Sequence, residues 1–433
     1  MSAGQLAIYG GDRAVNARFK EKWKQVRMRE VAALGWYVAR GVNTMPSGAG
    51  PVARFERKFA KRTGARYVLL MNSGTAALHS AFFAVGVKPG DEVIVPPYTF
   101  YASAGPVLHL GGVPVFCDID EATLTADPDD VESRITSRTR AICVVHVWGN
   151  PARLDRFVDI ARRHGIALIE DCSHAHGAMY QGRSVGTWGD IGCFSLQGNK
   201  PVSGGEAGVA ITENAVSFDH MLALAHSGRT ATQQGAGTFD MDDISFGLKY
   251  RPHLAAAQWA LGGLGRLDEL NARRARNYEI LTQALSETAA VTPIETYPDA
   301  VRGGYFEFVF RYEPDHAGGW PIGSFALAAR AEGVPINVDR YTRQGRRAAL
   351  LHESPVFSGI DFNGLGGFLG GPSGGQPVGG RGAPLRVAER LADRLLTLPP
   401  FTDVPENYVH EVGVALRKVA TGAARMRDSR TGG

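Results

Sequence analysis

A single lysine in a glycine-rich stretch is the first residue whose surroundings suggest chemistry. Lys200 is followed by Pro201 in the run CFSLQGNKPVSGGEAG, and the proline biases the lysine away from helical backbone. Lysine is rarely buried without a partner, and glycines often mark a close approach of the backbone to another group. An amine in such a place can attack a carbonyl and form a Schiff base, but an ordinary solvated lysine in a loop would account for the same sequence.

A second candidate is the segment NSGTAAL, residues 72–78, which follows an apolar run and opens a helical pattern. Gly74 permits a close approach of the backbone, and Thr75 offers a hydroxyl group. The first N–H groups of the new helix, together with its dipole, would favour a phosphate at this end. Taken alone this signal is weak, and a plain helix cap is the better explanation of the segment.

A third candidate is the pair of carboxylates, Glu170 and Asp171, that ends the otherwise aliphatic run IALIED. A carboxylate buried there needs a cationic partner, which could be the ring nitrogen of a cofactor or a nearby arginine. His174 and His176 follow closely, but their spacing supplies no further ligands, so no metal site is expected.

The NSGT and Glu170–Asp171 segments end predicted strands, and open α/β sheets bind ligands at the carboxyl ends of their strands. An amine, a strand-end aspartate and a phosphate cradle are together the equipment of a pyridoxal phosphate enzyme. The lysine would bind the aldehyde, the aspartate would keep the pyridine nitrogen protonated, and the helix terminus would hold the phosphate. The combination therefore predicts this cofactor, where each feature alone does not.

These residues need a sheet to bring them together, and the apolar pattern predicts one. Short, nearly continuous apolar runs are typical of parallel strands that are covered on both faces. Between them, segment 152–165 places Leu154, Phe157 and Ile160 on one helical face and ends in a glycine, as helices often do. The alternation predicts a large, doubly wound, mostly parallel α/β domain. The predicted strands are 67–71, 91–96, 113–119, 141–147 and 166–171.

The rest of the chain predicts a smaller C-terminal α+β domain. Segment 253–287 reads as a long helix or a helix pair that could bridge the domains, segment 303–314 alternates like a strand, and segments 384–400 and 405–420 suggest closing helices. The predicted division is an N-terminal arm (1–45), a large cofactor-binding domain (46–265), a small domain (266–420) with a glycine-rich loop (359–382), and a frayed tail (421–433).

Composition excludes several classes of protein. Of 433 residues, 44% are apolar and 21% charged, as in ordinary globular proteins, and 47 basic against 43 acidic residues give no bias toward nucleic acid. No run is long enough for a membrane helix, and the first residues lack the pattern of a secretory signal. Four widely separated cysteines fit reduced thiols, so we expect a cytoplasmic protein without metal or disulfides.

With these blocks in view, the chain resembles the DegT/DnrJ/EryC1/StrS family of aminotransferases, which are fold type I pyridoxal phosphate enzymes acting on keto-sugars and keto-cyclitols. The resemblance runs from about Phe55 to Leu270 and resumes near Leu385. Several blocks in the right order make it specific. They are FERKFAKRTGARYVLLMNSGTAAL, GDEVIVPPYTFYASA, HVWGNPARLD and EDCSHAHGAMYQGRSVGTWGDIGCFSLQGNKPVSGGEAGVAIT.

The resemblance implies a role for each matching position. Lys200 corresponds to the Schiff-base lysine and Asp171 to the partner of the pyridine nitrogen. Phe100 occupies the position of the aromatic residue that stacks on the ring, and His174 lies near the phenolic oxygen of the ring. The residues implied to contact the phosphate are Gly74, Thr75 and Ser195.

The resemblance also implies a homodimer in which a loop of the neighbouring subunit reaches the phosphate. The matching segment is GLKYRP, residues 247–252, where Lys249 replaces the usual asparagine. A cation there could still hold phosphate. Leu196 and Gly198–Asn199 also depart from the common Phe and Ala-Thr before the lysine, and these changes could reshape the substrate side of the pocket.

The implied activity is ping-pong transamination from Glu or Gln to a keto-cyclitol or keto-sugar in secondary metabolism, with pyridoxamine phosphate as the intermediate form of the cofactor. The opening LAIYGGDRAV favours the cyclitol and aminohydroxybenzoate subgroup, and His146, Trp148 and Tyr341 are candidate pocket residues. One alternative is a sugar dehydratase, although those relatives typically carry histidine where this chain has Lys200. Another is a non-catalytic protein that binds the cofactor.

Overall fold

The computed structural model describes residues 5–17, 26–226, 228–229, 246–338, 341, 350–358 and 384–431. Its centre is a seven-stranded sheet in the order β1-β9-β8-β5-β4-β2-β3. Strands β3, β2, β4, β5 and β8 run parallel, while β9 is antiparallel to both β1 and β8. The predicted α/β class with a mostly parallel sheet is confirmed. The strands are β1 (Tyr67–Met71), β2 (Glu92–Val95), β3 (Val113–Phe116), β4 (Thr139–Val145), β5 (Ala167–Asp171), β8 (Ile191–Ser195) and β9 (Gly208–Thr212).

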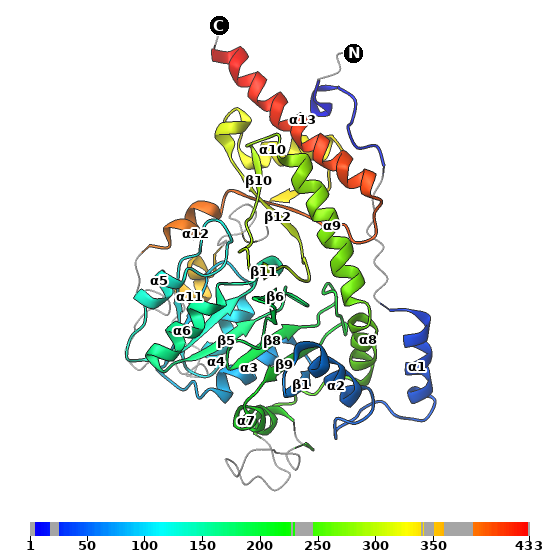
Figure 1. The fold of residues 1–433 in the computed structure, drawn as a ribbon, viewed down its shortest axis with the longest axis vertical. Coiled ribbons are helices and arrows are strands. Elements are labelled where there is room, and N and C mark those ends of the chain that lie inside the picture. Colours follow the sequence, from blue (N-terminus) through cyan, green and yellow to red (C-terminus); the bar gives the residue numbers. More distant parts are fainter. Residues whose placement is uncertain are drawn as a thin grey trace.

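Helices cover both faces of this sheet because successive side chains of each strand point to opposite sides. In β1, Leu69 and Met71 join the core under α3 and α7, whereas Val68 and Leu70 join the core under α2, α6 and α8. Figure 1 shows these helices around the sheet, with α1 packed outside α8. The helices are α1 (Met28–Val38), α2 (Pro51–Thr63), α3 (Gly74–Ala84), α4 (Gly105–His109), α5 (Pro128–Ser133), α6 (Leu154–His164), α7 (Ala215–Ala225) and α8 (Leu254–Leu264).

A second, antiparallel sheet forms the C-terminal part, in the order β10-β12-β14-β13, and α9, α10 and α13 pack with it around a separate core. The predicted helix over 384–400 is only half right, because LLTL is a buried strand that pairs with β12. These elements are β10 (Val291–Pro293), β12 (Phe308–Tyr312), β13 (Asn337–Val338), β14 (Leu395–Leu398), α9 (Leu267–Leu285), α10 (Ile322–Ala331) and α13 (Glu406–Thr431). Two short helices of the same stretch of chain, α11 (Pro355–Ser358) and α12 (Arg386–Leu391), pack into the core under α3 and α7.

Helix α9 connects the two parts, as the sequence predicted for segment 253–287. It begins just after α8 beside the large sheet and extends to α13 (Figure 1). A small third sheet joins the parts again, since β11 (Ala300–Val301) pairs with β6 (Met179–Tyr180), which pairs with β7 (Arg183–Ser184). The predicted domain boundary at residue 265 falls between α8 and α9, and the division into domains stays a prediction.

Three further expectations concern the C-terminal tail, the glycine-rich loop and membrane-spanning helices. The backbone of 421–431 continues α13, where the sequence predicted a frayed tail. The glycine-rich loop 359–382 lies outside the described residues. Among the helices that the structure describes, none has the length and apolar character needed to span a bilayer.

Candidate active site

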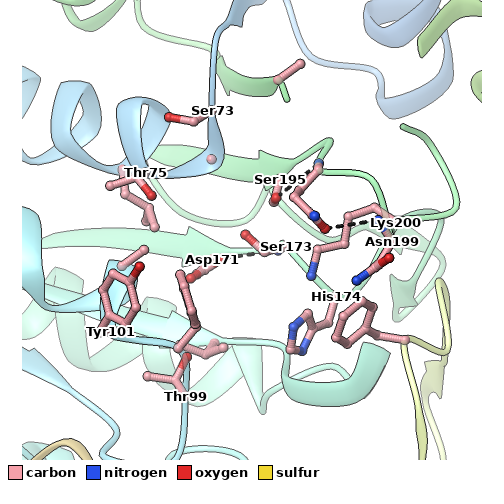
Figure 2. A pocket seen from close by; sticks show the side chains of 18 of the residues that line it. Ser73, Thr75, Thr99, Tyr101, Asp171, Ser173, His174, Ser195, Asn199 and Lys200 are labelled. Carbon is pink, nitrogen blue, oxygen red and sulfur yellow. Dashed lines mark hydrogen bonds between the residues drawn. The ribbon is translucent and has the colours of Figure 1, made fainter. Parts of the chain in front are cut away.

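The predicted catalytic groups converge on one cavity of about 470 Å³ at the carboxyl ends of the parallel strands. Asp171 ends β5, Ser195 ends β8, and α3 begins beside them (Figure 2). Seven of the eight predicted site residues line this cavity: Gly74, Thr75, Phe100, Asp171, His174, Ser195 and Lys200. The eighth, Lys249, is not among the residues that line it.

One end of the cavity is built by the start of α3. The hydroxyl oxygen of Ser73 accepts the backbone N–H of Ala76 at 3.0 Å and so caps the helix, as the simpler interpretation of NSGT predicted. Gly74 and Thr75 nevertheless line the cavity. A Cβ atom on Gly74 would lie 2.8 Å from the Cβ atom of Ser195, so glycine is needed for the helix start and β8 to approach this closely. The segment therefore caps α3 and also lines the cavity, and its binding of a phosphate stays a prediction.

The carboxylate of Asp171 is 4% exposed and is oriented by two hydrogen bonds. Its Oδ2 accepts the hydroxyl of Ser103 at 2.7 Å, and its Oδ1 accepts the backbone N–H of Ser173 at 3.0 Å. An oriented anion at the floor of the cavity is suited to a cationic ring nitrogen.

Lys200 lies across the cavity and is only 7% exposed. Its Nζ atom stands 3.6 Å from the centre of the Phe306 ring. Lys200 also interacts electrostatically with the neighbouring His176. Burial, as the larger cause, and the charge of Lys200, as the second, lower the pKa of that histidine to about 3. His174 stacks on the same Phe306 ring, with the ring centres 4.4 Å apart. Lys200 is thus a partly enclosed amine facing the cavity.

Phe306 was missed by the sequence analysis, as were several polar residues on the cavity wall. Phe306 belongs to the alternating segment 303–314, and nothing in that alternation indicates that the segment reaches the large domain. A neighbouring position could have been recognised, because Tyr101 directly follows Phe100. The other residues of this wall are Leu78, Thr99, Ala102, Val145, Ser173, Gln197, Asn199, Glu206 and Ala207.

The three candidate pocket residues have different positions. Tyr341 lines the cavity. Trp148 lies behind His174, with the ring centres 5.1 Å apart. It therefore supports a residue of the cavity wall without lining the cavity itself. His146 is fully buried and does not line the cavity. Its Nδ1 atom accepts the N–H of Ala152 at 3.0 Å, which leaves Nε2–H to donate to Glu170 at 3.1 Å.

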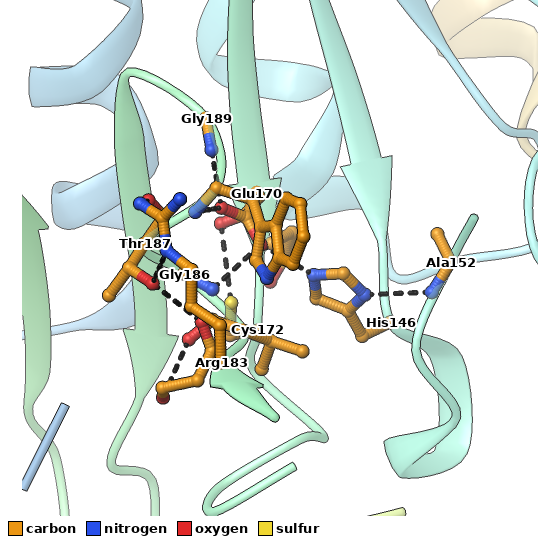
Figure 3. A network of polar contacts seen from close by, with 12 residues as sticks. His146, Ala152, Glu170, Cys172, Arg183, Gly186, Thr187 and Gly189 are labelled. Atoms are coloured by element: carbon orange, nitrogen blue, oxygen red, sulfur yellow. Dashed lines mark hydrogen bonds and ion pairs between the residues drawn. The ribbon is translucent and has the colours of Figure 1, made fainter. Parts of the chain in front are cut away.

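Glu170 is the centre of this second, structural network (Figure 3). Its two oxygens accept the backbone N–H groups of Gly186, Trp188 and Gly189, each at 2.7 Å, besides the His146 contact. His146, Glu170 and Cys172 lie close enough together for a metal, but the carboxylate oxygens already accept N–H donors. Burial raises the pKa of the Cys172 thiol, which opposes the thiolate that a metal needs. The cluster therefore anchors the backbone of residues 186–189 through Glu170.

Lys249 is exposed, and its segment lies against Asn72, just before the start of α3, in the same chain. The side-chain N–H of Asn72 donates to the carbonyl oxygen of Lys249 at 3.2 Å, and the backbone N–H of Asn72 donates to the carbonyl oxygen of Tyr250 at 2.7 Å. The Tyr250 hydroxyl also pairs with His79 Nδ1 at 2.9 Å. A contact between Lys249 and the phosphate of a neighbouring subunit stays a prediction.

Comparison with known proteins agrees with this geometry. The sequence profile of the DegT/DnrJ/EryC1/StrS aminotransferase family matches residues 25–317. The chain is 37% identical to the L-glutamine:scyllo-inosose aminotransferase of Streptomyces griseus, over 82% of this chain and 87% of that protein. It is 39% identical to the L-glutamine:2-deoxy-scyllo-inosose aminotransferase of Micromonospora echinospora, over 72% and 76%.

Solved structures show the same fold. 3-Amino-5-hydroxybenzoic acid synthase superposes with a TM-score of 0.76 at 26% identity, covering 95% of this chain and all of that one. DesI, solved in the presence of its TDP-sugar product, superposes with a TM-score of 0.78 at 27% identity, covering 99% of both chains. The predicted resemblance and the predicted activity are confirmed. The chain belongs to the DegT/DnrJ/EryC1/StrS aminotransferase family and is a fold type I, pyridoxal phosphate-dependent aminotransferase.

Proposed function

We propose that this enzyme transfers the amino group of L-glutamine to a keto-cyclitol of the inosose type, in the biosynthesis of an aminoglycoside-like secondary metabolite. The observation that carries the proposal is the likeness to inosose aminotransferases, at 37% and 39% identity over most of the chain. The two solved structures of the same fold, at only 26% and 27% identity, are 3-amino-5-hydroxybenzoic acid synthase and DesI with its TDP-sugar product. The fold therefore accommodates several acceptors, and the sequence likeness favours the cyclitol.

The cavity residues fit pyridoxal 5'-phosphate. Because Gly74 lets the start of α3 approach Ser195 closely, the first N–H groups of α3 and the Ser195 hydroxyl lie at the same end of the cavity, where they would hold phosphate oxygens. Thr75 and Ser195 add hydroxyl donors at that end, and Asp171 lies on the floor with both oxygens oriented. Phe100 and His174 stand on the walls, at the positions that the family resemblance assigns to the ring. When bound, the cofactor supplies an aldehyde for a lysine amine and a pyridinium ring that accepts electrons.

In this proposal the chain's own residues bind, orient and move protons. Asp171 would pair with the charged ring nitrogen, because its carboxylate is oriented at the cavity by hydrogen bonds from the Ser103 hydroxyl and the Ser173 backbone N–H. Lys200 Nζ is placed to take the proton that leaves the α-carbon of the donor, as general base, and would deliver it as general acid to the cofactor carbon that carried the aldehyde. Both halves of a ping-pong reaction use the same amine, with pyridoxamine phosphate as the intermediate form of the cofactor.

Three parts of the proposal concern the assembly and its location. Phe100 is 47% exposed and Tyr101 is 59% exposed, although both line the cavity, so a partner surface could complete the site. A homodimer with shared active sites would supply that surface and bring Lys249 toward the phosphate of the neighbouring subunit. We place the enzyme in the cytoplasm, where its four buried cysteines would remain reduced thiols.

A labelled-donor screen tests the function. Purified enzyme with pyridoxal phosphate is given L-glutamine carrying 15N at the α-amino group, together with either scyllo-inosose, 2-deoxy-scyllo-inosose or a nucleotide-linked keto-sugar. We expect 15N in the cyclitol amine, detected by mass spectrometry, and neither amine nor visible cofactor band with K200A. Labelled product from the nucleotide-linked ketones alone would contradict the cyclitol acceptor, and faster transfer from L-glutamate would contradict the donor. A cofactor band without any amine product would indicate a non-catalytic binder.

A further inference from the structure

The ring of Phe306 covers the amine of Lys200. The Nζ atom lies 3.6 Å from the ring centre, and the lysine is 7% exposed. The face of an aromatic ring attracts a cation, and the attraction is greater where water is excluded. Phe306 comes from the segment just before β12, whereas Lys200 comes from the loop after β8. The contact therefore joins the small sheet to the catalytic amine.

We propose that Phe306 is a positioning residue that holds the Lys200 amine in its protonated form against the cavity wall, in the enzyme without cofactor and after the amine has taken a proton. This inference rests on the proposed function only in taking Lys200 as the cofactor's lysine. It gives the protonated amine a defined place between the step in which it takes a proton and the step in which it gives one up. Without the ring, the released amine would lose this favourable contact for its charged form.

The ring is fixed by a stack of aromatic side chains. Phe306 lies on His174 at 4.4 Å with an angle of 14° between the planes, and His174 lies on Trp148 at 5.1 Å and 23°. The backbone N–H of Trp148 donates to Nδ1 of His174 at 3.3 Å. On the far side, the indole N–H of Trp148 donates to the Tyr98 hydroxyl at 2.9 Å. Phe306 is therefore presented face-on to Lys200 by a supported stack.

The backbone just before Phe306 is also held against the segments that carry Trp148 and His174 and against helix α9. The N–H of Gly303 donates to the carbonyl oxygen of Gly149 at 3.1 Å, and the N–H of Gly304 donates to Asn271 Oδ1 at 3.0 Å. A Cβ atom on Gly304, whose φ is +72°, would lie 2.2 Å from the carbonyl oxygen of His174. Only glycine permits that approach, so the sequence GGYF brings Phe306 to the large domain.

Other ionisable groups also face the amine or its cavity, and they remain in place when only the ring is changed. They come from β5 and the loop after it, from η2 (Tyr101–Ser103), from the segment before β9, and from elements around His176. The groups that line the cavity are Asp171, His174, Tyr101, Glu206 and, after β13, Tyr341. His176 interacts with Lys200 from outside the cavity, and Arg62 and Arg274 act in turn on His176. A shift caused by removing the ring can therefore be assigned to the ring itself.

Capture of the cofactor measures the protonation state directly. Only the neutral amine condenses with the aldehyde, releasing water, so the rate at which the visible band appears in apoenzyme with added pyridoxal phosphate follows the neutral fraction. We expect F306L to lower the pH of half-maximal rate by about 0.5 to 1 unit, the shift that a typical cation–π contact produces. Below that pH the variant should capture the cofactor about 3- to 10-fold faster, after normalisation to the high-pH plateau.

Two further proteins separate the charge effect from packing. F308L removes a buried ring two positions along, in the core with Tyr278 and Phe401, and should keep the wild-type midpoint. Fluorinated phenylalanines at position 306 keep the shape of the ring while weakening its attraction for cations, and the midpoint should fall with each added fluorine. A wild-type midpoint in both F306L and the fluorinated series would overturn the proposal. Because no acceptor ketone enters this assay, its outcome is independent of which ketone the enzyme uses.

Discussion

Two adjacent carboxylates, Glu170 and Asp171, do different work because they point to opposite sides of strand β5. Asp171 faces the cavity with two hydrogen-bond donors. Glu170 faces the other side, where three backbone N–H groups and His146 surround it. The sequence analysis identified both as candidates for pairing with a cation. Only the alternation of the strand separates the residue placed for chemistry from the one that anchors the loop at 186–189.

Matched amide substitutions should separate these two roles. D171N keeps the shape of the side chain but removes its charge. We therefore expect kcat to fall by about 100-fold or more, the size of effect seen when one electrostatic group is removed, while the free energy of unfolding changes little. E170Q turns one acceptor oxygen into an N–H donor that faces other donors, and should lower the free energy of unfolding by about 2 to 4 kcal/mol. Steady-state kinetics and urea denaturation test both variants. Equal stability losses, or a fully active D171N, would contradict this division.

At the scale of elements, the sequence predicted what repeats locally and missed what depends on distant contacts. The apolar runs predicted the strands of the large sheet, and NSGT predicted the start of α3. LLTL was assigned to a helix because PLRVAERLADR before it has helical periodicity, and only its pairing with β12 makes it a strand. Phe306 was missed for a related reason, since its place over Lys200 depends on packing between segments about 100 residues apart. The sequence therefore predicted the site residues that lie within one local motif, but not those that packing between distant segments brings to the cavity.

Helix α9 is the element that holds this assembly together. The side-chain N–H of Asn271 donates to the carbonyl oxygen of His176 at 2.8 Å, and its Oδ1 accepts from Gly304 at 3.0 Å. Asn271 thus joins the His174 loop to the Phe306 loop. Arg274, one turn further, is buried and hydrogen-bonds the carbonyl oxygen of Gly304 and the hydroxyl of Thr402. The helix sets the wall of the cavity without lining it.

Removing the Asn271 amide should therefore affect substrate binding more than stability. We expect N271A to raise KM for the ketone by about 3- to 30-fold, corresponding to the loss of one or two hydrogen bonds, while the cofactor still binds. Arg273 offers a matched control on the same helix, since it is exposed and makes surface ion pairs with Glu269 and Asp403, so R273A should behave like wild type. Initial rates over a range of ketone concentrations measure the effect. Unchanged KM in N271A would show that the two loops keep their positions without it.

At the scale of the whole molecule, three buried histidines tie stability to pH. Burial and the nearby His109 lower the pKa of His79 on α3 to about 4. Burial, with Lys200 as the second cause, lowers the pKa of His176 to about 3, and burial with Arg229 does the same for His226 at the end of α7. All three are therefore neutral in the folded protein over the range in which they gain a proton when unfolded. Glu56 opposes them, since burial raises the pKa of its carboxyl.

The sign of the effect follows from proton binding. Between pH 6.5 and about 4 the unfolded chain binds more protons at these histidines than the folded chain does. The free energy of unfolding therefore decreases as the pH is lowered, by about 2 kcal/mol per histidine at pH 5. His226 is the cleanest probe, because it does not line the cavity and both its ring nitrogens are buried without a hydrogen bond among the described residues. H226L should lose about a third of the drop in urea midpoint between pH 7.5 and pH 5, whereas H316L, at an exposed position, should keep all of it. If H226L shows the same drop as wild type, the buried histidines are not what makes the protein acid-sensitive, and the carboxylates must carry the effect.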